Sequence, residues 1–214
     1  MTVYSMQGEF LSEITYLVCR DGKALIIDPG ARGERILAEC ASLSVTPVAV
    51  LLTHGHADHV LGAAALQRAG LKVYACDEEF SVITGKANLA VALGFALDAF
   101  TPDVAVKDDD VLTLAPFMVK VIQTPGHTQG GVCYLIEKAL FTGDTLFPGS
   151  YGRTDFPTGD EQDLLCSIAN VLFELPMDTE VYSGHGFSGR TAAPAAPQTT
   201  IGEEYSTNPI LNLL

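Results

Sequence analysis

The chain has 214 residues, of which 48% are hydrophobic, and this length and composition allow one sizeable core in a single domain. Its 26 acidic and 12 basic residues give a formal net charge of −14, a field that repels phosphate backbones and so argues against nucleic acid as a partner. No apolar run approaches the roughly 20 residues that a membrane-spanning helix requires, so we expect no membrane partner either.

The first half of the chain is predicted to alternate short strands with short helices. Arg20-Asp21-Gly22 has the composition of a hairpin turn between two apolar runs. The run over 48–52 is typical of a buried strand, and apolar residues at helical spacing follow it from position 59. Strands are expected over 15–18, 24–27, 48–52 and 72–75, further helices over 34–41, 77–84 and 88–93, and a loop over 99–110.

The second half is predicted to contain strands, one longer helix and a short terminal helix. Thr200 and Glu203 have the spacing of a capping box, which indicates where the terminal helix begins. The strands are expected over 118–123, 131–136, 139–142 and 181–183, and the longer helix over 160–173.

Four potential metal ligands follow the strand over 48–52 within six residues, in the order His54, His56, Asp58 and His59. His54 and His56 are two apart in an extended loop, so their imidazoles can point to the same side. Asp58 and His59 can reach a second, adjacent position. A single histidine here would favour a polar surface loop, but three histidines clustered with an aspartate predict a metal site.

Three further candidates, His127, Asp144 and His185, each lie just past a predicted strand in a loop that contains glycine. Two metal ions with four or five ligands each need about six to eight protein ligands. Asp28, in Asp28-Pro29-Gly30, is interpreted as a turn residue and is given no ligand role. The predicted sets are His54, His56 and His127 for one ion, Asp58, His59 and His185 for the other, and Asp144 as a bridge.

These motifs resemble the metallo-β-lactamase superfamily, whose His-x-His-x-Asp-His signature is matched by His54-Gly-His56-Ala-Asp58-His59. Thr124-Pro-Gly-His127-Thr, Gly143-Asp144-Thr and Gly184-His185-Gly match the later motifs in order. The resemblance implies an α/β fold, the αββα four-layer sandwich, in which two sheets face each other with helices outside and the metals at one edge. It covers nearly the whole chain, so we expect residues 1–214 to form one metallo-hydrolase domain.

Two other segments are similar to the short, single-domain, glyoxalase II-like members of that superfamily. They are Phe141-Thr-Gly-Asp-Thr-Leu-Phe147 with Ser150-Tyr-Gly-Arg-Thr-Asp-Phe-Pro157, and Thr199-Thr-Ile-Gly-Glu-Glu204 with Asn208-Pro209. The chain departs from these relatives at 187–196, which is interpreted as an inserted loop beside a metal ligand. It is expected to be a surface loop, with a lid over the site as the alternative. Full-length glyoxalase II also has a C-terminal helical domain, for which 214 residues leave no room.

The resemblance and the predicted ligand set favour hydrolysis of a thioester such as a hydroxyacylglutathione. In this hypothesis two divalent ions, most simply zinc with iron or manganese as alternatives, share a bridging hydroxide that attacks the acyl carbon, and Asp58 and Asp144 are catalytic. A thiol with a pKa of about 8.5 can leave as thiolate without a general acid. Arg153 is expected to hold a substrate carboxylate or to pair with Asp155, and Tyr151 to line the pocket or to pack.

The main alternative is an oxidoreductase that resembles the mono-iron persulfide dioxygenases, which share the signature and a Gly-Arg-Thr-Asp-Phe stretch. A non-catalytic metal-binding protein would be expected to have lost ligands, and none is missing here. The cysteines at 19, 40, 76, 133 and 166 are scattered, odd in number and form no Cys-x-x-Cys pair. That spacing suits a reducing compartment, so we expect a cytoplasmic protein.

Overall fold

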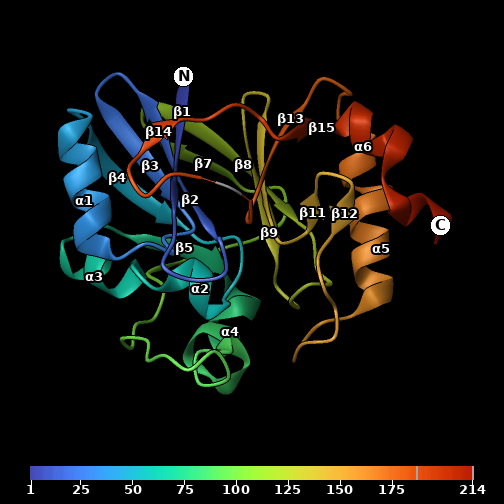
Figure 1. Ribbon diagram of the computed structural model, residues 1–214, viewed down its shortest axis with the longest axis horizontal. Coiled ribbons are helices and arrows are strands. Elements are labelled where there is room, and N and C mark those ends of the chain that lie inside the picture. The colour runs from blue at the N-terminus through green and yellow to red at the C-terminus, as the bar shows by residue number, and fades with distance from the viewer. Residues whose placement is uncertain (187, 214) are drawn as a thin grey trace.

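The computed structural model describes residues 1–186 and 188–213, and in these residues two β-sheets pack face to face with helices on both outer sides (Figure 1). The strand order of the first sheet is β14-β1-β2-β3-β4-β5-β6. Its strands are β1 (Thr2–Gln7), β2 (Ile14–Arg20), β3 (Lys23–Ile27), β4 (Thr46–Leu51), β5 (Val73–Cys76), β6 (Val104–Val106) and β14 (Ala193–Pro194).

The second sheet has the strand order β15-β13-β10-β9-β8-β7. Its strands are β7 (Val111–Leu114), β8 (Phe117–Gln123), β9 (Val132–Ile136), β10 (Ala139–Gly143), β13 (Glu180–Ser183) and β15 (Thr199–Thr200), beside the small hairpin of β11 (Leu146–Phe147) and β12 (Ser150–Tyr151). In Figure 1, α1 (Gly33–Ser42) and α3 (Ala63–Arg68) flank the first sheet, while α5 (Glu161–Asn170) and α6 (Ile201–Thr207) flank the second.

Three apolar layers hold these elements together, which confirms the αββα sandwich. Between the sheets, the ring of Tyr16 packs edge-on against Phe141 at a centroid distance of 5.3 Å. A second layer lies between the first sheet and α1 and α3, where Ile36 and Leu66 are fully buried. A third lies between the second sheet and α5, around Ile168. Burial of this apolar surface is the main stabilising term of the fold.

Parallel pairing brings several strand ends to one edge of the molecule. Strand β3 pairs in parallel with β4, with Ile27 opposite Leu51, so the residues that follow both strands emerge together. Strand β10 pairs in parallel with β13, with Gly143 opposite Ser183. Strand β8 runs in the same direction as β10, because each is antiparallel to β9. All the predicted ligand loops therefore leave the sheets at the same side.

The predicted strands and longer helices are present, but several other segments differ from expectation. The helix expected over 88–93 is instead the one-turn η2 (Lys86–Asn88) followed by turns. The Asn88 side chain accepts a hydrogen bond from the backbone N–H of Ala90 at 2.9 Å, an Asx turn that competes with helix formation. The loop expected over 99–110 contains the short edge strand β6, and the strands β1 and β7 were not predicted.

The described part of the segment 187–196 is largely irregular and exposed, as expected of a surface loop, and contains the two-residue strand β14; Phe187 itself lies outside the described residues. Strand β14 pairs antiparallel with β1, with Tyr4 opposite Pro194, so the segment extends the first sheet at its edge. The carbonyl of Gly189 also accepts a hydrogen bond from the N–H of Gln7 at 2.8 Å. Residues 188–196 therefore lie along β1, not as a lid across the site.

At the terminal helix, the Thr200 side chain accepts the N–H of Glu203, as the capping-box spacing predicts. The remaining helical elements are α2 (Ala57–Val60), α4 (Phe80–Thr84), η1 (Asp77–Glu79), η3 (Leu172–Glu174) and η4 (Pro209–Asn212). None of the helices in the described part of the chain has the length and apolar content that a bilayer crossing requires.

Candidate metal centre

All seven predicted ligands converge at the sheet edge where the parallel strands end. His54 and His56 lie on the loop between β4 and α2, and Asp58 and His59 lie in α2 itself. From the second sheet, His127 follows β8, Asp144 follows β10 and His185 follows β13. Both sheets therefore contribute side chains to one cluster, as their strand topology requires.

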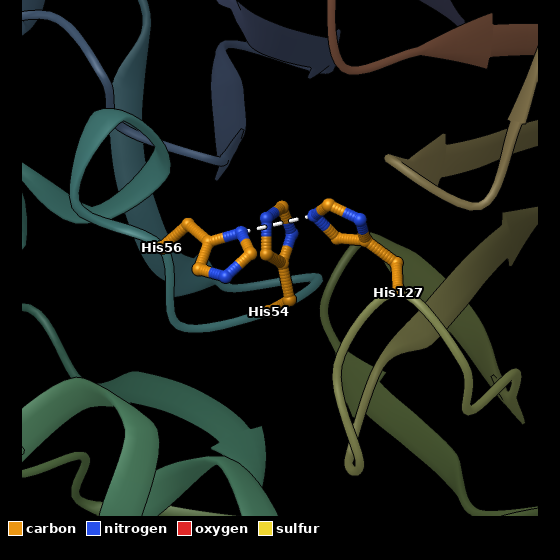
Figure 2. Close-up of side chains that lie close together, drawn as sticks. All are labelled: His54, His56 and His127. Carbon is orange, nitrogen blue, oxygen red and sulfur yellow. Dashed lines mark hydrogen bonds between the residues drawn. The ribbon is translucent and has the colours of Figure 1, made fainter. Parts of the chain in front are cut away.

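The first predicted set, His54, His56 and His127, forms a compact triad whose rings lie close together and nearly perpendicular to one another (Figure 2). One nitrogen of each ring lies within 4.8 Å of the corresponding nitrogens of the other two. In one of these contacts, Nε2 of His127 lies 2.9 Å from Nδ1 of His56. All three side chains are buried, so the triad offers three nitrogen donors out of bulk water.

The second predicted set, Asp58, His59 and His185, forms another triad beside the first. Nε2 of His59 and Nε2 of His185 are 3.2 Å apart, and Oδ2 of Asp58 lies 3.5 Å from the latter. Asp144 lies between the triads: its Oδ2 is 3.5 Å from Nε2 of His127 and 3.2 Å from Nε2 of His185. This geometry fits the bridging position predicted for Asp144.

Hydrogen bonds on the outer side of the histidines prepare them as ligands. Nδ1 of His127 donates to the carbonyl of Arg153 at 2.7 Å, and Nδ1 of His185 donates to that of Leu11 at 2.9 Å. A ring that donates from Nδ1 keeps a lone pair on Nε2, the nitrogen that faces the cluster. His56 is oriented the other way, with Nδ1 toward the cluster.

Unpartnered buried atoms indicate that the cluster is built for cations. Within the described residues, Nε2 of His54 and Oδ1 of Asp144 are buried without a hydrogen-bond partner. Such atoms are costly in a folded protein unless another group compensates them. A divalent ion at each triad would coordinate them, because nitrogen and carboxylate donors are those that zinc, iron and manganese accept. The residues therefore fit a dinuclear metal site.

Burial and neighbouring charges set the protonation states that such a site requires. Burial lowers the pKa of His56 to about 3 and that of His54 well below its usual range, so both imidazoles are neutral. Burial alone would raise the pKa of Asp144, but the adjacent His59 and His185 outweigh it and hold that pKa well below the usual range. Neutral imidazole and ionised carboxylate are the ligand forms.

Asp28 also belongs to this centre, although its sequence context predicts only a turn residue. It does have the positive φ of a turn residue, at 47°. Its Oδ2, however, accepts hydrogen bonds from Nδ1 of His59 at 3.0 Å and from Oγ1 of Thr53 at 2.6 Å. The parallel pairing of β3 with β4 was the signal that could have found it, because residues after neighbouring parallel strands meet at one edge.

Glu79 was also not predicted, and it connects two ligand loops. It is fully buried, and its Oε2 accepts the N–H of Gly55 at 2.6 Å while its Oε1 accepts that of Gly130 at 2.9 Å. Gly55 separates His54 from His56, and Gly130 lies three residues after His127. One carboxylate thus ties the two loops of the first triad, a contact across 51 residues of sequence that no local pattern could indicate.

A cavity of about 770 Å³ opens over the cluster, and both predicted substrate-binding residues line it. The pairing of Arg153 with Asp155 is present: Nε and Nη2 donate to the two carboxylate oxygens at 2.8 and 2.7 Å. The described lining residues are Leu11, His56, Asp58, Leu89, Leu93, His127, Asp144, Phe147, Pro148, Ser150, Tyr151, Arg153, Phe156, His185, Gly186 and Gln198.

Comparison with known proteins agrees with this geometry. The family model of the metallo-beta-lactamase superfamily matches residues 10–185. Hydroxyacylglutathione hydrolase GloC of Haemophilus influenzae is 37% identical over 195 residues, which cover 88% of this chain and 87% of the relative.

Solved structures extend the likeness to the whole fold. The BLEG-1 B3 metallo-beta-lactamase superposes with a TM-score of 0.87 at 33% identity, over 98% of this chain and 99% of that one. TTHA1623 in a di-iron-bound form gives 0.82 at 34% identity, covering 96% and 98% of the two chains. ETHE1 from Myxococcus xanthus gives 0.77 at 32% identity, covering 98% and 84%.

Proposed function

This chain belongs to the metallo-beta-lactamase superfamily, and on that premise we propose that it is a dinuclear metallo-hydrolase that cleaves a thioester such as a hydroxyacylglutathione. The observation that carries the proposal is the pair of triads, joined by Asp144, beneath an open cavity. The likeness to the hydroxyacylglutathione hydrolase of Haemophilus influenzae supports the thioester as substrate.

In this proposal each triad holds one divalent ion and Asp144 is shared between them. Zinc is the proposed metal, and the similar di-iron form of TTHA1623 keeps iron as the main alternative. Ions bound there would lower the pKa of water and polarise the thioester carbonyl. The residues that would hold them are His54, His56 and His127 on one side, Asp58, His59 and His185 on the other, and Asp144 between.

The protein's own side chains would contribute position and charge. Asp58 lines the cavity and is buried, so its carboxylate can take up a proton from the attacking water. A thiolate leaving group, with a pKa of about 8.5, departs without a proton donor, which suits a centre whose histidines all face the cluster. Asp144 would chiefly fix the distance between the two ions.

Arg153 and Tyr151 are the proposed substrate-binding residues at the rim of the cavity. Arg153 is exposed, with 64% of its side chain accessible, so a substrate carboxylate can reach its guanidinium. The Asp155 carboxylate already pairs with that guanidinium, so a substrate would share or displace it. Tyr151 lines the cavity on β12 and also packs against the apolar layer around α5.

A mono-iron persulfide dioxygenase is the second candidate function. The stretch Gly152-Arg153-Thr154-Asp155-Phe156, which resembles that class, has Arg153 and Phe156 in the cavity lining. One iron per chain and oxygen uptake with glutathione persulfide would support this candidate. Asp58 and His59 belong to the signature that both classes share, so the hydrolase is favoured by His185, which completes the second triad and lies 3.2 Å from Asp144.

The test combines metal analysis with a hydrolysis assay. We expect about two metal ions per chain and measurable hydrolysis of S-lactoylglutathione that chelation abolishes. His185→Ala should lower the metal content toward one ion and reduce kcat/KM by at least about 100-fold, because the second triad loses a ligand. A chain that carries two ions and hydrolyses no thioester, or that consumes oxygen with a persulfide, would contradict the proposal.

A further inference from the structure

The cavity over the metal centre has two chemically different ends. One end lies over the first triad, at Arg153, whose backbone carbonyl accepts a hydrogen bond from Nδ1 of His127. The other end lies over the second triad, at Leu11, whose backbone carbonyl accepts a hydrogen bond from Nδ1 of His185. A thioester whose carbonyl lies between the triads must direct one substituent toward each end. The two ends therefore select for the two halves of the substrate.

The end over the second triad is apolar. Leu11 lines it, and the ring of Phe147 lies 6.1 Å from that of His185. Leu89 and Leu93 also line the cavity and belong to the segment whose Phe95 stacks on Phe10, so we group them with Leu11 as the leucine wall. Leu11 is 59% exposed and Leu93 is 37% exposed. Large apolar side chains left open to water in a concave surface beside a catalytic centre are typical of ligand contacts.

An aromatic contact holds the wall together from two distant segments. The ring of Phe10 stacks on that of Phe95, with centroids 4.1 Å apart and planes 3° from parallel. Phe10 precedes Leu11, and Phe95 follows Leu93 by two residues. The stack therefore joins the turn that carries Leu11 to the segment that carries Leu89 and Leu93, and it preorganises the wall before substrate binds.

The three leucine side chains of the wall offer neither a positive charge nor a hydrogen-bond donor to an anionic or strongly polar group. Among the described residues that line the cavity, Arg153 is the only lysine or arginine, and it lies at the opposite end. The chain as a whole carries a net charge of −14. A charged group near the wall would lose hydration without gaining a partner, whereas an alkyl group would gain from burial.

We infer that the site is selective for thioesters with an apolar acyl group of several carbons, which lies against the leucine wall while the thiol portion extends toward Arg153. The inference rests on the proposed thioesterase function and narrows it: S-acylglutathiones with alkyl chains are better substrates than S-lactoylglutathione. Leu93 and Leu11 are then residues that determine specificity.

Binding of uncleavable thioethers tests the wall without any reaction. We expect the affinity for S-methyl-, S-butyl- and S-hexylglutathione, measured by calorimetry, to rise about twofold to fourfold for each added methylene. Leu93→Asn should flatten this rise, lowering the hexyl-to-methyl ratio by at least about fivefold. Val91→Asn is the matched control, because Val91 is 88% exposed on the same segment and is not among the lining residues.

Leu11→Asn provides a second variant that should fold. Leu11 has a φ of 53°, and asparagine tolerates this left-handed conformation better than most residues, so the turn is preserved. We expect it to flatten the chain-length dependence as Leu93→Asn does. A rise with chain length that neither substitution reduces would overturn the role of the wall.

Hydrolysis of acetyl-, butanoyl-, hexanoyl- and lactoylglutathione separates this inference from the proposed function. The leaving group is constant in this series, so kcat/KM should rise with the alkyl chain and be lowest for the short or polar acyl groups. Hydrolysis that is independent of chain length, or fastest for lactoyl, overturns the inference and retains the thioesterase. Chain-length-dependent binding without any hydrolysis overturns the thioesterase and retains the apolar subsite.

Discussion

Asp28 couples the two triads through a single carboxylate. Its Oδ2 accepts a hydrogen bond directly from Nδ1 of His59 in the second triad. The same oxygen accepts a hydrogen bond from the Thr53 hydroxyl. That hydroxyl in turn accepts a hydrogen bond from Nδ1 of His54 in the first triad. One side chain thus sets the ring orientation of a histidine on each side, in the manner of the carboxylates that orient metal-binding imidazoles.

The cysteines, unlike Asp28, take no part in the metal centre. Cys133, a residue of β9, is fully buried, and burial raises the pKa of its thiol to about 12. A buried, protonated thiol acts as a small apolar side chain. Cys166 on α5 is the exposed one.

We expect one thiol of the native protein, that of Cys166, to react quickly with Ellman's reagent at about pH 8. Burial raises the pKa of Cys19 and Cys76 to about 11 and that of Cys40 and Cys133 to about 12, so at this pH those four stay protonated as well as shielded. Absorbance should show one fast equivalent before denaturation and five after. A fast equivalent that remains in Cys166→Ser would contradict this assignment.

At the scale of elements, the centre depends on loops held by contacts that are remote in sequence. Glu79, at the end of η1, accepts one N–H from each of the two loops that carry the first triad. Glycine at position 55 lets this approach occur: a Cβ there would lie 2.9 Å from the Glu79 carboxylate and from two side chains of α4. The first triad is therefore spaced by η1 and α4 as well as by its own strands.

Glu79→Gln should weaken metal binding at the first triad by about tenfold to 100-fold while leaving the second triad less affected. The amide can accept only one of the two N–H groups, and its NH₂ faces the other, so one buried donor loses its partner at a cost of about 1–3 kcal/mol. Competition of Co²⁺ with a chelator, followed by absorbance, measures both affinities.

Glu78→Gln is the control for that variant, because the neighbouring Glu78 is exposed. Its two metal affinities should match those of the unaltered protein. Equal losses at both triads in Glu79→Gln would indicate general destabilisation, and unchanged affinities would show that Glu79 does not space the first triad.

The same contrast between local sequence and distant contacts decides which features could be predicted from the sequence. The seven predicted ligands could be found because each follows an apolar strand, a local pattern that the topology then brings to one edge. Strand β6 is only three residues long and pairs with β5, so its identity depends on a partner that local sequence does not specify. The leucine wall depends in the same way on the stack of Phe10 with Phe95, across 85 positions.

At the scale of the whole molecule, the metal centre lies across the junction of the two sheets. The cluster contains converging histidine nitrogens and, among the described residues, a buried Asp144 oxygen that has no hydrogen-bond partner. Bound ions would tie the sheets together and compensate these atoms. The ligands from the first sheet's side are His54, His56, Asp58 and His59, and those from the second are His127, Asp144 and His185.

Removal of metal should therefore lower the melting temperature of the whole protein and not only its activity. An ion present at 100 times its Kd adds about 2.7 kcal/mol, and about 2–4 °C per kcal/mol is usual for a chain of this size, so chelation of two ions should lower Tm by at least about 10 °C. Calorimetry of the loaded and chelated protein measures the difference. In His185→Ala this difference in melting temperature should shrink, because the second sheet loses one of its ligands. In Val91→Asn the difference should equal that of the unaltered protein. Equal melting temperatures with and without metal would mean that the ions do not join the sheets, because a ligand that binds only the folded state must stabilise it.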